Sequence, residues 1–324
     1  MSQPVLVRVS CQAMGCLCEV YLGGDSAVDL EAIGSDALTL LQIWESRLSH
    51  YIADSEICTL NREAYQRPIQ VSPELFRLLE RLRSLTEETE GAFDPTAGRL
   101  VRAWGLFRQG TLRGEQVEPP SATEVIQIVQ EIGWSRVELD TELQTVSFQT
   151  SSIELHLGAA GKGYIVDEVI AYLRQQGIER ALVNVGGSSI AAIGSPPQSE
   201  YWVLGIADPQ DSEIAVTQAL LRDNALTTSG SMESVVTYTG RRICHLFDPR
   251  TGEPIAFQGA VSAITPTALE GDVLTTGFYV NGEAWTEKYC RRHPDIQVLW
   301  IETNEERGAP RWARFGTTQS RFLI

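Results

Sequence analysis

Asp272 and Thr276 stand four residues apart in the apolar segment EGDVLTTGFYVNG, which runs from Glu270 to Gly282. If this segment is helical, side chains at i and i+4 lie on one face, so a carboxylate and a hydroxyl converge there. Two hard oxygen donors suit Mg²⁺, which takes oxygen ligands and keeps several waters or substrate phosphates. A polar stripe that faces solvent is the alternative, and the segment alone leaves both interpretations open.

Residues on either side of this segment mark the ends of a helix. Thr265 is suited to the N-cap and Pro266 to the first turn. Asn281 and Gly282 are typical of a C-terminal stop. The pattern therefore predicts a helix from Ala268 to Val280 that carries both oxygen donors.

A second candidate site is the segment IELHLGAAGKGYIVDEV (153–169), which has the pattern of an alternating strand, a glycine-rich bend, a lysine and then a helix. Such a bend presents backbone N–H groups and the positive end of a helix dipole to an anion, and Lys162 adds a charge. The pattern therefore indicates phosphate binding. It matches neither a Walker A loop nor the G-x-G-x-x-G fingerprint, so a simple tight turn is an equal alternative.

Two further segments carry groups that chemistry could use. Gly186 and Gly187 interrupt two apolar strands in ALVNVGGSSIAAIG (181–194), which indicates either close approach of the backbone to a ligand or a bulge. His245 stands where a strand ends, shortly before the turn DPRTG (248–252). A catalytic histidine and a structural one fit that position equally well.

The elements that must position these groups begin with a set of short strands. Alternating runs at 4–9, 16–22, 136–140 and 145–149 predict strands, because every second residue is apolar or β-branched. Hairpin-like strands then dominate from about Ala181 to Ser262.

Helical patterns lie between these strands. An apolar stripe predicts a helix from Asp29 to Leu48, and Ser72 and Ser121 are the expected N-caps of two more. The mixture indicates an α/β or an α+β protein. Since no internal repeat or low-complexity tract is present, we interpret residues 1–324 as a single domain with a cleft. The Gly- and Pro-rich stretch 108–123 is the expected exposed loop beside it.

The composition narrows the possible partners. The 324 residues carry a formal charge of -16, which would repel nucleic acid and anionic membrane surfaces. No apolar stretch approaches the roughly 18 residues of a membrane-spanning helix, and the start lacks the features of a signal peptide. The chain as given is therefore expected in the cytoplasm, or in the periplasm or at the membrane if an export segment was removed. Its six cysteines are scattered, which favours buried thiols over a disulfide framework.

Eight segments spread over most of the chain carry a family signature. They are QAMGCLCEVYL (12–22), WESRLSHYIADSEICTLN (44–61), TEGAFDPTAGRLVRAWG (89–105), HLGAAGKGYIVD (156–167), LVNVGGSSI (182–190), TTSGSMES (227–234), HLFDPRTGEP (245–254) and TPTALEGDVLTTGFYV (265–280). In this order they resemble the ApbE family, the FAD:protein FMN transferases. Each segment alone is weak, but eight in sequence order are hard to obtain by chance.

The resemblance implies an α+β fold of mixed, largely antiparallel sheets flanked by helices. It also implies an FAD cleft between two packed lobes, with Mg²⁺ at the pyrophosphate. Asp272 and Thr276 then fall on the family's metal ligands, joined by a backbone carbonyl of the Gly-Ala-Ala bend that we assign to Ala159. A cation would explain why an apolar helix carries a carboxylate. The positions that match the lining of the flavin nucleotide are Met14, Tyr51, Ala92, Phe93, Asp94, Lys162 and Leu246.

The implied reaction breaks the pyrophosphate of FAD. A threonine hydroxyl in the flavinylation motif of an acceptor flavoprotein attacks the FMN phosphorus, AMP departs, and a phosphodiester forms. Mg²⁺ spreads the charge of the transferring group, which places Asp272 among the catalytic residues. His245 is the first candidate for a general base.

Three positions depart from the family pattern, since Cys16, His156 and Ser188 replace its usual Thr, Asp and Asp. The Asp that His156 replaces contacts FAD beside the metal, and a neutral His156 would hydrogen-bond the nucleotide instead. Two alternatives to the transferase follow: an FAD pyrophosphatase that gives FMN and AMP, and a member that binds FAD without turnover. The pair Asp272 and Thr276 favours catalysis, because a metal site serves little purpose if the pyrophosphate is never cleaved.

Overall fold

The computed structural model covers most of the chain. It describes residues 4–106, 118–231, 235–238, 241–244, 246–255, 258–303, 310–317 and 320–323. The candidate base His245 lies outside the described residues, and so does most of the expected loop 108–123.

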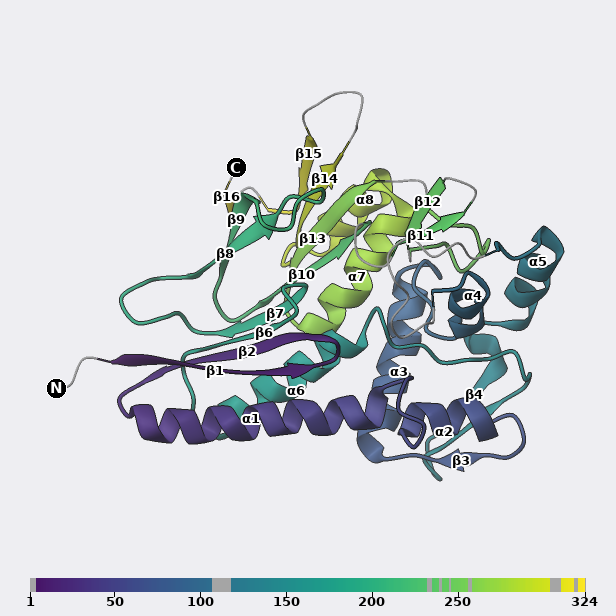
Figure 1. Cartoon of the computed structure of the whole chain (residues 1–324), viewed down its shortest axis with the longest axis horizontal. Coiled ribbons are helices and arrows are strands. Elements are labelled where there is room, and N and C mark those ends of the chain that lie inside the picture. Colours follow the sequence, from purple (N-terminus) through teal and green to yellow (C-terminus); the bar gives the residue numbers. More distant parts are fainter. Residues whose placement is uncertain are drawn as a thin grey trace.

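An eight-stranded sheet forms the centre of the molecule (Figure 1). In spatial order its strands are β1 (Val5–Ala13), β2 (Cys16–Gly24), β6 (Ala181–Val185), β7 (Ser189–Ile193), β10 (Ala225–Gly230), β13 (Gly259–Thr265), β14 (Gln297–Glu302) and β15 (Arg311–Phe315). All neighbouring pairs are antiparallel. The predicted α+β class with largely antiparallel sheets is confirmed.

Helices cover one face of this sheet and a small second sheet covers part of the other (Figure 1). The helices are α1 (Ala27–Leu48), α6 (Gly161–Gln175), α7 (Ala268–Asn281) and α8 (Glu283–Arg292). The small sheet contains β8 (Trp202–Ala207), β9 (Ala215–Leu221) and β16 (Phe322–Leu323). Its buried Trp202, Leu221 and Phe322 pack on the apolar residues that the central sheet presents on this side.

A second, mainly helical lobe lies beside the sheet, at the right of Figure 1. Its elements are α2 (Glu56–Glu63), β3 (Ile69–Gln70), α3 (Pro73–Glu88), α4 (Gly98–Ala103), α5 (Ala122–Glu131), a 3-10 turn (Trp134–Arg136), β4 (Val137–Asp140) and β5 (Thr145–Phe148). The hairpin β11 (Val235–Tyr238) and β12 (Arg241–Cys244) forms a separate two-stranded sheet. One hydrophobic cluster runs from α1 and α6 into this lobe. That residues 1–324 form a single domain stays a prediction.

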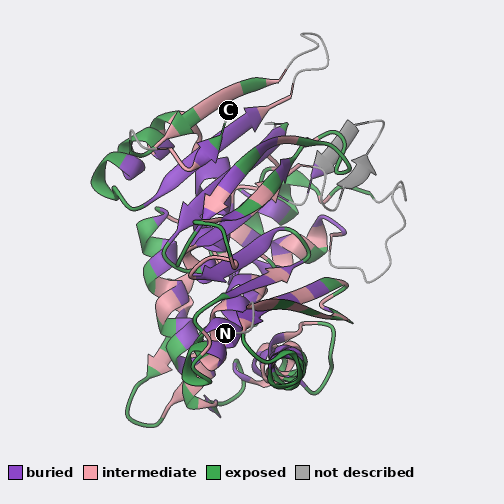
Figure 2. Ribbon diagram, turned by 90° about the vertical axis from the view of Figure 1, so that its left-hand side faces the viewer, coloured by how far each residue is buried: buried purple, intermediate pink, exposed green. Residues whose placement is uncertain are grey.

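Burial along the central sheet follows from what covers each strand (Figure 2). Every residue of β7 (SIAAI) and β13 (GAVSAIT) is buried, because both faces of these inner strands are covered. Such strands need near-continuous runs of apolar or small residues. The edge strand β1 instead alternates between half-buried and exposed residues. The composition of these strands therefore matches their place in the sheet.

Most of the predicted helix starts are confirmed. The side chains of Ser72 and Ser121 accept the N–H groups of Leu75 and Glu124, as N-caps do. The helix expected from Asp29 to Leu48 extends over Ala27–Leu48.

The N-cap predicted for α7 is wrong by two residues. Thr267 caps the helix, because its hydroxyl accepts the N–H of Glu270 at 3.3 Å. Thr265 Oγ1 instead donates to the Thr267 carbonyl at 2.8 Å. Thr267 has the extended backbone of an N-cap, with φ -131° and ψ 154°, so the helix begins after it and Pro266 lies outside the helix. At the other end, Gly282 has φ 83° and stops α7 as expected.

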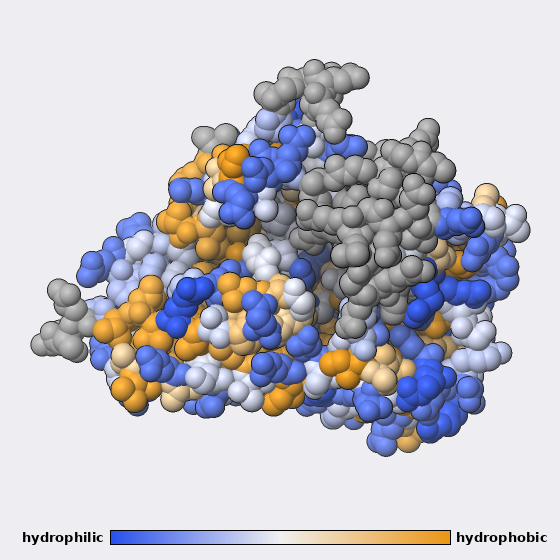
Figure 3. Space-filling view, in the orientation of Figure 1, coloured by the Kyte–Doolittle hydropathy of each residue, from blue (hydrophilic) through white to orange (hydrophobic). Residues whose placement is uncertain are grey.

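The surface is mixed in polarity (Figure 3). Exposed apolar side chains include Leu6 and Leu17 on the β1–β2 hairpin. Val203 and Leu323 are also exposed, on the small sheet of β8, β9 and β16, which we call the outer sheet. Within the described parts of the chain, no helix is both long and apolar enough to cross a bilayer.

Candidate active site

A cleft of about 360 Å³ opens between the two lobes, and a cavity of about 740 Å³ adjoins it. Both volumes lie in the range of small-molecule sites. The two spaces share residues such as Met14, Lys162 and Ser188. Every predicted site residue that the structure describes lines the cleft: Met14, Tyr51, Ala92, Phe93, Asp94, His156, Ala159, Lys162, Leu246, Asp272 and Thr276.

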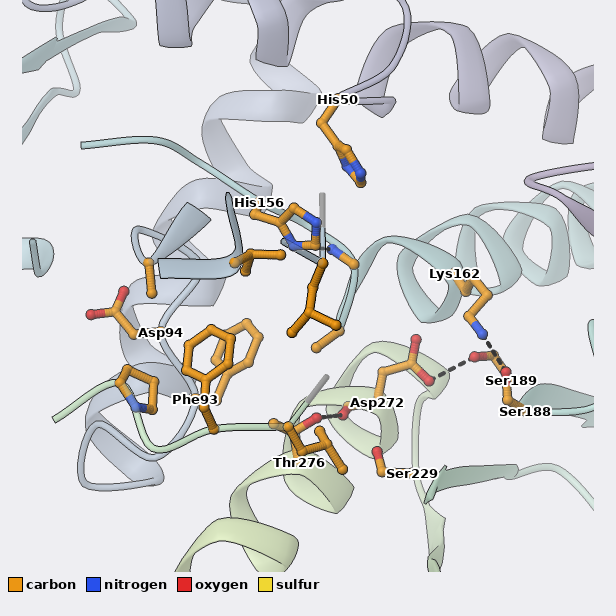
Figure 4. Close-up of a pocket in the computed structure, with 18 of the residues that line it drawn as sticks. His50, Phe93, Asp94, His156, Lys162, Ser188, Ser189, Ser229, Asp272 and Thr276 are labelled. Carbon is orange, nitrogen blue, oxygen red and sulfur yellow. Dashed lines mark hydrogen bonds between the residues drawn. The ribbon is translucent and has the colours of Figure 1, made fainter. Parts of the chain in front are cut away.

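Asp272 lies at the floor of the cleft, with 8% of its surface exposed (Figure 4). Its Oδ2 accepts the backbone N–H of Gly163 at 2.6 Å, and its Oδ1 accepts the hydroxyl of Ser189 at 2.7 Å. Thr276 lies one turn later, where its hydroxyl donates to the Asp272 carbonyl at 3.2 Å. The polar stripe that the sequence left open faces the cleft and not bulk solvent.

The helices α6 and α7 cap each other. Gly163 is the third residue of α6, so its N–H has no partner within that helix, and Asp272 of α7 accepts it. In return, Asp167 of α6 accepts the N–H groups of Ala268 and Leu269 at 2.8 and 2.9 Å. Two carboxylates thus fix the register between the helices and the orientation of the Asp272 side chain.

Burial dominates the electrostatics of the capping carboxylate on α6. It raises the pKa of the Asp167 carboxyl to about 7, while the two N–H groups that it accepts act in the opposite direction. The nearby charge of Asp272 raises this pKa further. Two acidic groups therefore lie close together in a poorly solvated junction, where a positive charge would be favourable.

Glycine allows the two helices to approach this closely. A Cβ atom at Gly163 would lie 2.3 Å from the Ala268 carbonyl oxygen and 2.8 Å from Asp272 Oδ2. Both distances are below what real side chains tolerate, so any larger residue would push α7 away. The glycine-rich bend is therefore required by packing as well as by its exposed N–H groups.

The donor set at the floor of the cleft fits a hard divalent cation. A carboxylate has about four acceptor sites, and the bonds from Gly163 and Ser189 use one site on each oxygen of Asp272. The Thr276 hydroxyl and the Ala159 residue line the same cleft. The described residues include no cluster of three or more His, Cys, Asp or Glu suited to a metal. The side chains of Asp272 and Thr276 offer oxygen donors, which suit Mg²⁺ better than a transition metal.

Lys162 brings a positive charge to the cleft next to Asp272 (Figure 4). It is the second residue of α6, and its ammonium group donates a hydrogen bond to the hydroxyl of Ser188. A lysine and the start of a helix together form an environment for an anion. This placement agrees with the phosphate-binding interpretation of the segment 153–169.

Three aromatic rings lie in contact at the other side of the cleft. The centroid of the His50 ring lies 3.9 Å from that of Tyr51 and 4.2 Å from that of His156, with the ring planes tilted by 50° and 38°. Burial lowers the pKa of His50 to about 4, so this imidazole is neutral at pH 7. The backbone N–H of Gly158 donates to His156 Nδ1 at 3.3 Å, which orients that ring. These rings connect the loop after α1 to the segment before the glycine-rich bend.

A tight hairpin turn places Met14 at the cleft. Ala13 and Cys16 are the last paired residues of β1 and β2, so Met14 and Gly15 form a two-residue loop. Both have positive φ, 54° and 70°, as in a type I′ turn. Glu45 of α1 accepts the Met14 N–H at 2.6 Å and holds this turn in place.

The triplet Ala92, Phe93 and Asp94 lies on the helical lobe and lines the cleft. The Asp94 carboxylate turns away from the cleft and accepts both the N–H and the hydroxyl of Thr96 (Figure 4). Burial raises its pKa. Asp94 therefore shapes the loop, and contact with a ligand would come from its backbone or from Phe93.

Four residues of this site were not singled out by the sequence: His50, Gly163, Asp167 and Ser189. Their partners are distant in sequence, as in the Ser189 to Asp272 bond, which spans 83 positions. Local patterns carry no signal for such pairs. All four do lie within segments that showed the family resemblance (44–61, 156–167 and 182–190), which is the one available indication.

Comparison with known proteins shows similarity to one family. The chain matches the model of the ApbE family over residues 14–300. A protein from Klebsiella pneumoniae (strain 342) named FAD:protein FMN transferase is 29% identical over 301 residues, which cover 91% of this chain and 90% of that protein. A protein of the same name from Salmonella typhimurium is 30% identical and covers 87% of this chain and 80% of its own length.

Solved structures share the fold. The ApbE protein of Thermotoga maritima has a TM-score of 0.83 at 25% identity and covers 95% of this chain and 96% of its own. The flavin transferase ApbE of Vibrio cholerae has a TM-score of 0.80 at 25% identity and covers 97% of this chain and 98% of its own.

Proposed function

The chain belongs to the ApbE family, and on that premise we propose that it transfers FMN from FAD to a threonine hydroxyl of an acceptor protein, with release of AMP and dependence on Mg²⁺. The relatives named FAD:protein FMN transferase support FAD as substrate and a protein as acceptor. The threonine, the AMP product and the metal are the finer parts of the proposal.

The observation that carries the proposal is the buried Asp272 carboxylate in a cleft with oxygen donors around it. Asp272, Thr276 and the Ala159 carbonyl would hold Mg²⁺. When bound, the ion would spread the negative charge of the transferring phosphoryl group and stabilise the departing AMP. The pair of buried carboxylates favours a cation at this position.

Other residues of the chain would bind and orient the dinucleotide. Lys162 and the first N–H groups of α6 provide positive potential for the pyrophosphate. The rings of Tyr51, His50 and His156, which contact one another, would provide aromatic surface for a ring of the ligand. The helical lobe closes the cleft from the opposite side through Phe93. Holding both phosphates in one geometry accounts for much of the rate enhancement in such reactions.

Incubation of the purified chain with FAD tests the proposal. We expect AMP release with Mg²⁺ and none with excess EDTA. A threonine-bearing acceptor domain should become fluorescent in a denaturing gel, and a matched acceptor with Thr→Ala should not. AMP without labelled acceptor would identify an FAD pyrophosphatase instead. Bound FAD without AMP would identify a binding protein, and either result would contradict the transferase.

A further inference from the structure

We propose that Glu45 is a positioning residue for the dinucleotide, because its carboxylate holds Met14 in a left-handed backbone conformation where the cleft meets the adjoining cavity. The inference rests on the proposed binding of FAD and adds a residue that acts on this ligand through another residue. It starts from backbone strain, which persists in a folded chain only where the surrounding structure enforces it.

Met14 has a backbone conformation that its residue type disfavours. Its φ is 54°, and it occupies the first position of a type I′ turn, where Asn, Asp and Gly are preferred. Five non-glycine residues of the described chain have positive φ, and Met14 is the one among them that lines the cleft or the cavity. The strain therefore coincides with the candidate active site.

Met14 lies at the boundary between the two spaces. The residues that line both of them are Met14, His50, Tyr51, Gly158, Lys162 and Ser188. A dinucleotide has two ring systems joined by a pyrophosphate, so a ligand that fills both spaces would cross this boundary. The position of the Met14 side chain therefore affects how well such a ligand fits.

Glu45 provides the contact that holds this conformation. Its Oε1 accepts the Met14 N–H at 2.6 Å, across 31 positions of sequence. A hydrogen bond to an ionised carboxylate is stronger than one between neutral groups. Glu45 belongs to α1, which lies along the β1–β2 hairpin and is anchored by the buried side chains of Trp44 and Leu48 (Figure 1). The helix therefore fixes the position of the turn.

Direct binding of phosphate does not explain a carboxylate at this place. Among the described residues that line the cavity, the charged side chains are those of Glu45 and Lys162, and His50 is neutral at pH 7. A carboxylate repels the phosphates of the ligand, so direct contact with them would weaken binding. Acceptance of the Met14 N–H is the role that the structure shows for Glu45.

The test compares variants of the full chain by the KM for FAD in AMP release, the Kd for FAD from flavin fluorescence, and the free energy of unfolding in urea. Glu45→Ala removes the acceptor, so KM and Kd should rise by about tenfold, the lower end of what a hydrogen bond to a charged group contributes. Glu45→Gln keeps an acceptor oxygen, so both should stay within about threefold of the parent. The value of kcat should be unchanged, because the groups proposed to act on the phosphates are not altered.

Glu31→Ala is the matched control. It removes an exposed carboxylate from the same helix, and it should change neither KM nor Kd. If Glu45→Ala does not fold, Glu45→Met takes its place, because it restores the volume of the side chain without an acceptor.

A double-mutant cycle tests whether Glu45 acts through Met14. Met14→Gly is the reference, because glycine adopts positive φ without help and has no side chain to position. In that background, Glu45→Ala should raise the KM for FAD by less than about twofold further.

The outcomes separate this inference from the proposed function. A rise in KM that persists undiminished in the Met14→Gly background would show direct contact of Glu45 with the ligand and overturn the inference. Equal losses in Glu45→Gln and Glu45→Ala, or lower stability with unchanged KM, would also overturn it. Absence of AMP from the parent would contradict the proposed function alone, because the fluorescence titration still tests Glu45. A parent that does not bind FAD would contradict both.

Discussion

The α6–α7 junction and the layer between the central and outer sheets are buried to a similar degree, but the junction contains polar residues and the layer contains apolar ones. In the junction, Asp272 is 8% exposed and Ser189 is fully buried, and both are hydrogen-bonded. In the layer, Leu221 is fully buried and Trp202 is 6% exposed, and both pack on apolar neighbours. Similar burial therefore serves two purposes. In the junction it holds polar groups whose hydrogen bonds need defined directions, and in the layer it forms an apolar core whose contacts do not.

The difference shows where the molecule specifies geometry. Apolar burial contributes free energy roughly in proportion to area and tolerates small shifts. A buried polar group is stable only if its partners stay within hydrogen-bonding distance. The junction is therefore the part of the structure in which a displacement of a fraction of an ångström would matter most for function.

The largest effect is expected from Asp272→Ala. If this carboxylate holds the metal, turnover should fall by at least about 1000-fold, because a loss of several kcal/mol of transition-state stabilisation corresponds to that factor. The measurement is AMP release from FAD at saturating Mg²⁺. The exposed Asp25→Ala is the matched control and should keep the parent rate. AMP production by Asp272→Ala at the parent rate would remove the metal assignment.

The next largest effect concerns the apolar layer. Leu221→Ala leaves a cavity under the outer sheet and should lower the free energy of unfolding by about 2–5 kcal/mol. Turnover per folded molecule should stay the same, because the layer does not touch the cleft. Denaturant titration and AMP release measure the two quantities. Leu323→Ala, on the same sheet but 46% exposed, serves as the control. Lost turnover at full folding would show that the two regions are coupled.

A smaller effect should distinguish the partners of Asp272. Ser189→Ala removes one donor to this carboxylate, so we expect the half-saturating Mg²⁺ concentration to rise by about 10–100-fold, as for other residues that orient metal ligands. The KM for FAD should change little. Ser229→Ala removes a neighbouring hydroxyl that does not bond to Asp272, and it should leave the Mg²⁺ requirement alone. Equal responses of the two variants would argue against a specific role of Ser189.

The smallest effect is a change in how steeply the free energy of unfolding depends on pH. The pKa of Asp167 is about 7 in the folded chain against a usual 3.8, so between these values the folded state keeps a proton that the unfolded state has lost. This stabilisation is complete below about pH 3.8 and is lost as the pH rises through about 7. The slope approaches about 1.4 kcal/mol per pH unit. Asp167→Asn should remove it.

Urea titrations of the parent and of Asp167→Asn between pH 4 and pH 7.5 measure that slope, with the exposed Asp25→Asn as control. The two variants should differ in the pH dependence of the free energy of unfolding and not only in its value. Parallel profiles for the parent and Asp167→Asn would show that Asp167 does not titrate in this range.

Much of this site was accessible from sequence because its residues lie in locally recognisable segments. The apolar run with Asn281 and Gly282 at its end predicts α7, and the i and i+4 rule places Thr276 beside Asp272. The N-cap was misplaced at Thr265 because Thr265 followed by Pro266 and Thr267 both fit a helix start, as Ser72 followed by Pro73 does. The local pattern does not decide between the two threonines.

The partners of these residues were not accessible in the same way. The bond from Gly163 to Asp272 spans 109 positions, and the contact between the His50 and His156 rings depends on how two loops pack. Hydrophobic periodicity predicts elements but not which polar atoms meet across them. Reciprocal capping also needs a glycine that fits under a carbonyl of another helix, which only the three-dimensional arrangement shows.

The mutual capping of α6 and α7 has a consequence for synthesis on the ribosome. The Gly163 amide is made 109 residues before the carboxylate that receives it, a delay of about 5–20 s at common rates of translation. During that interval the N–H groups in the first turn of α6 depend on solvent for their hydrogen bonds. A nascent chain therefore cannot complete the proposed site until Asp272 has left the exit tunnel.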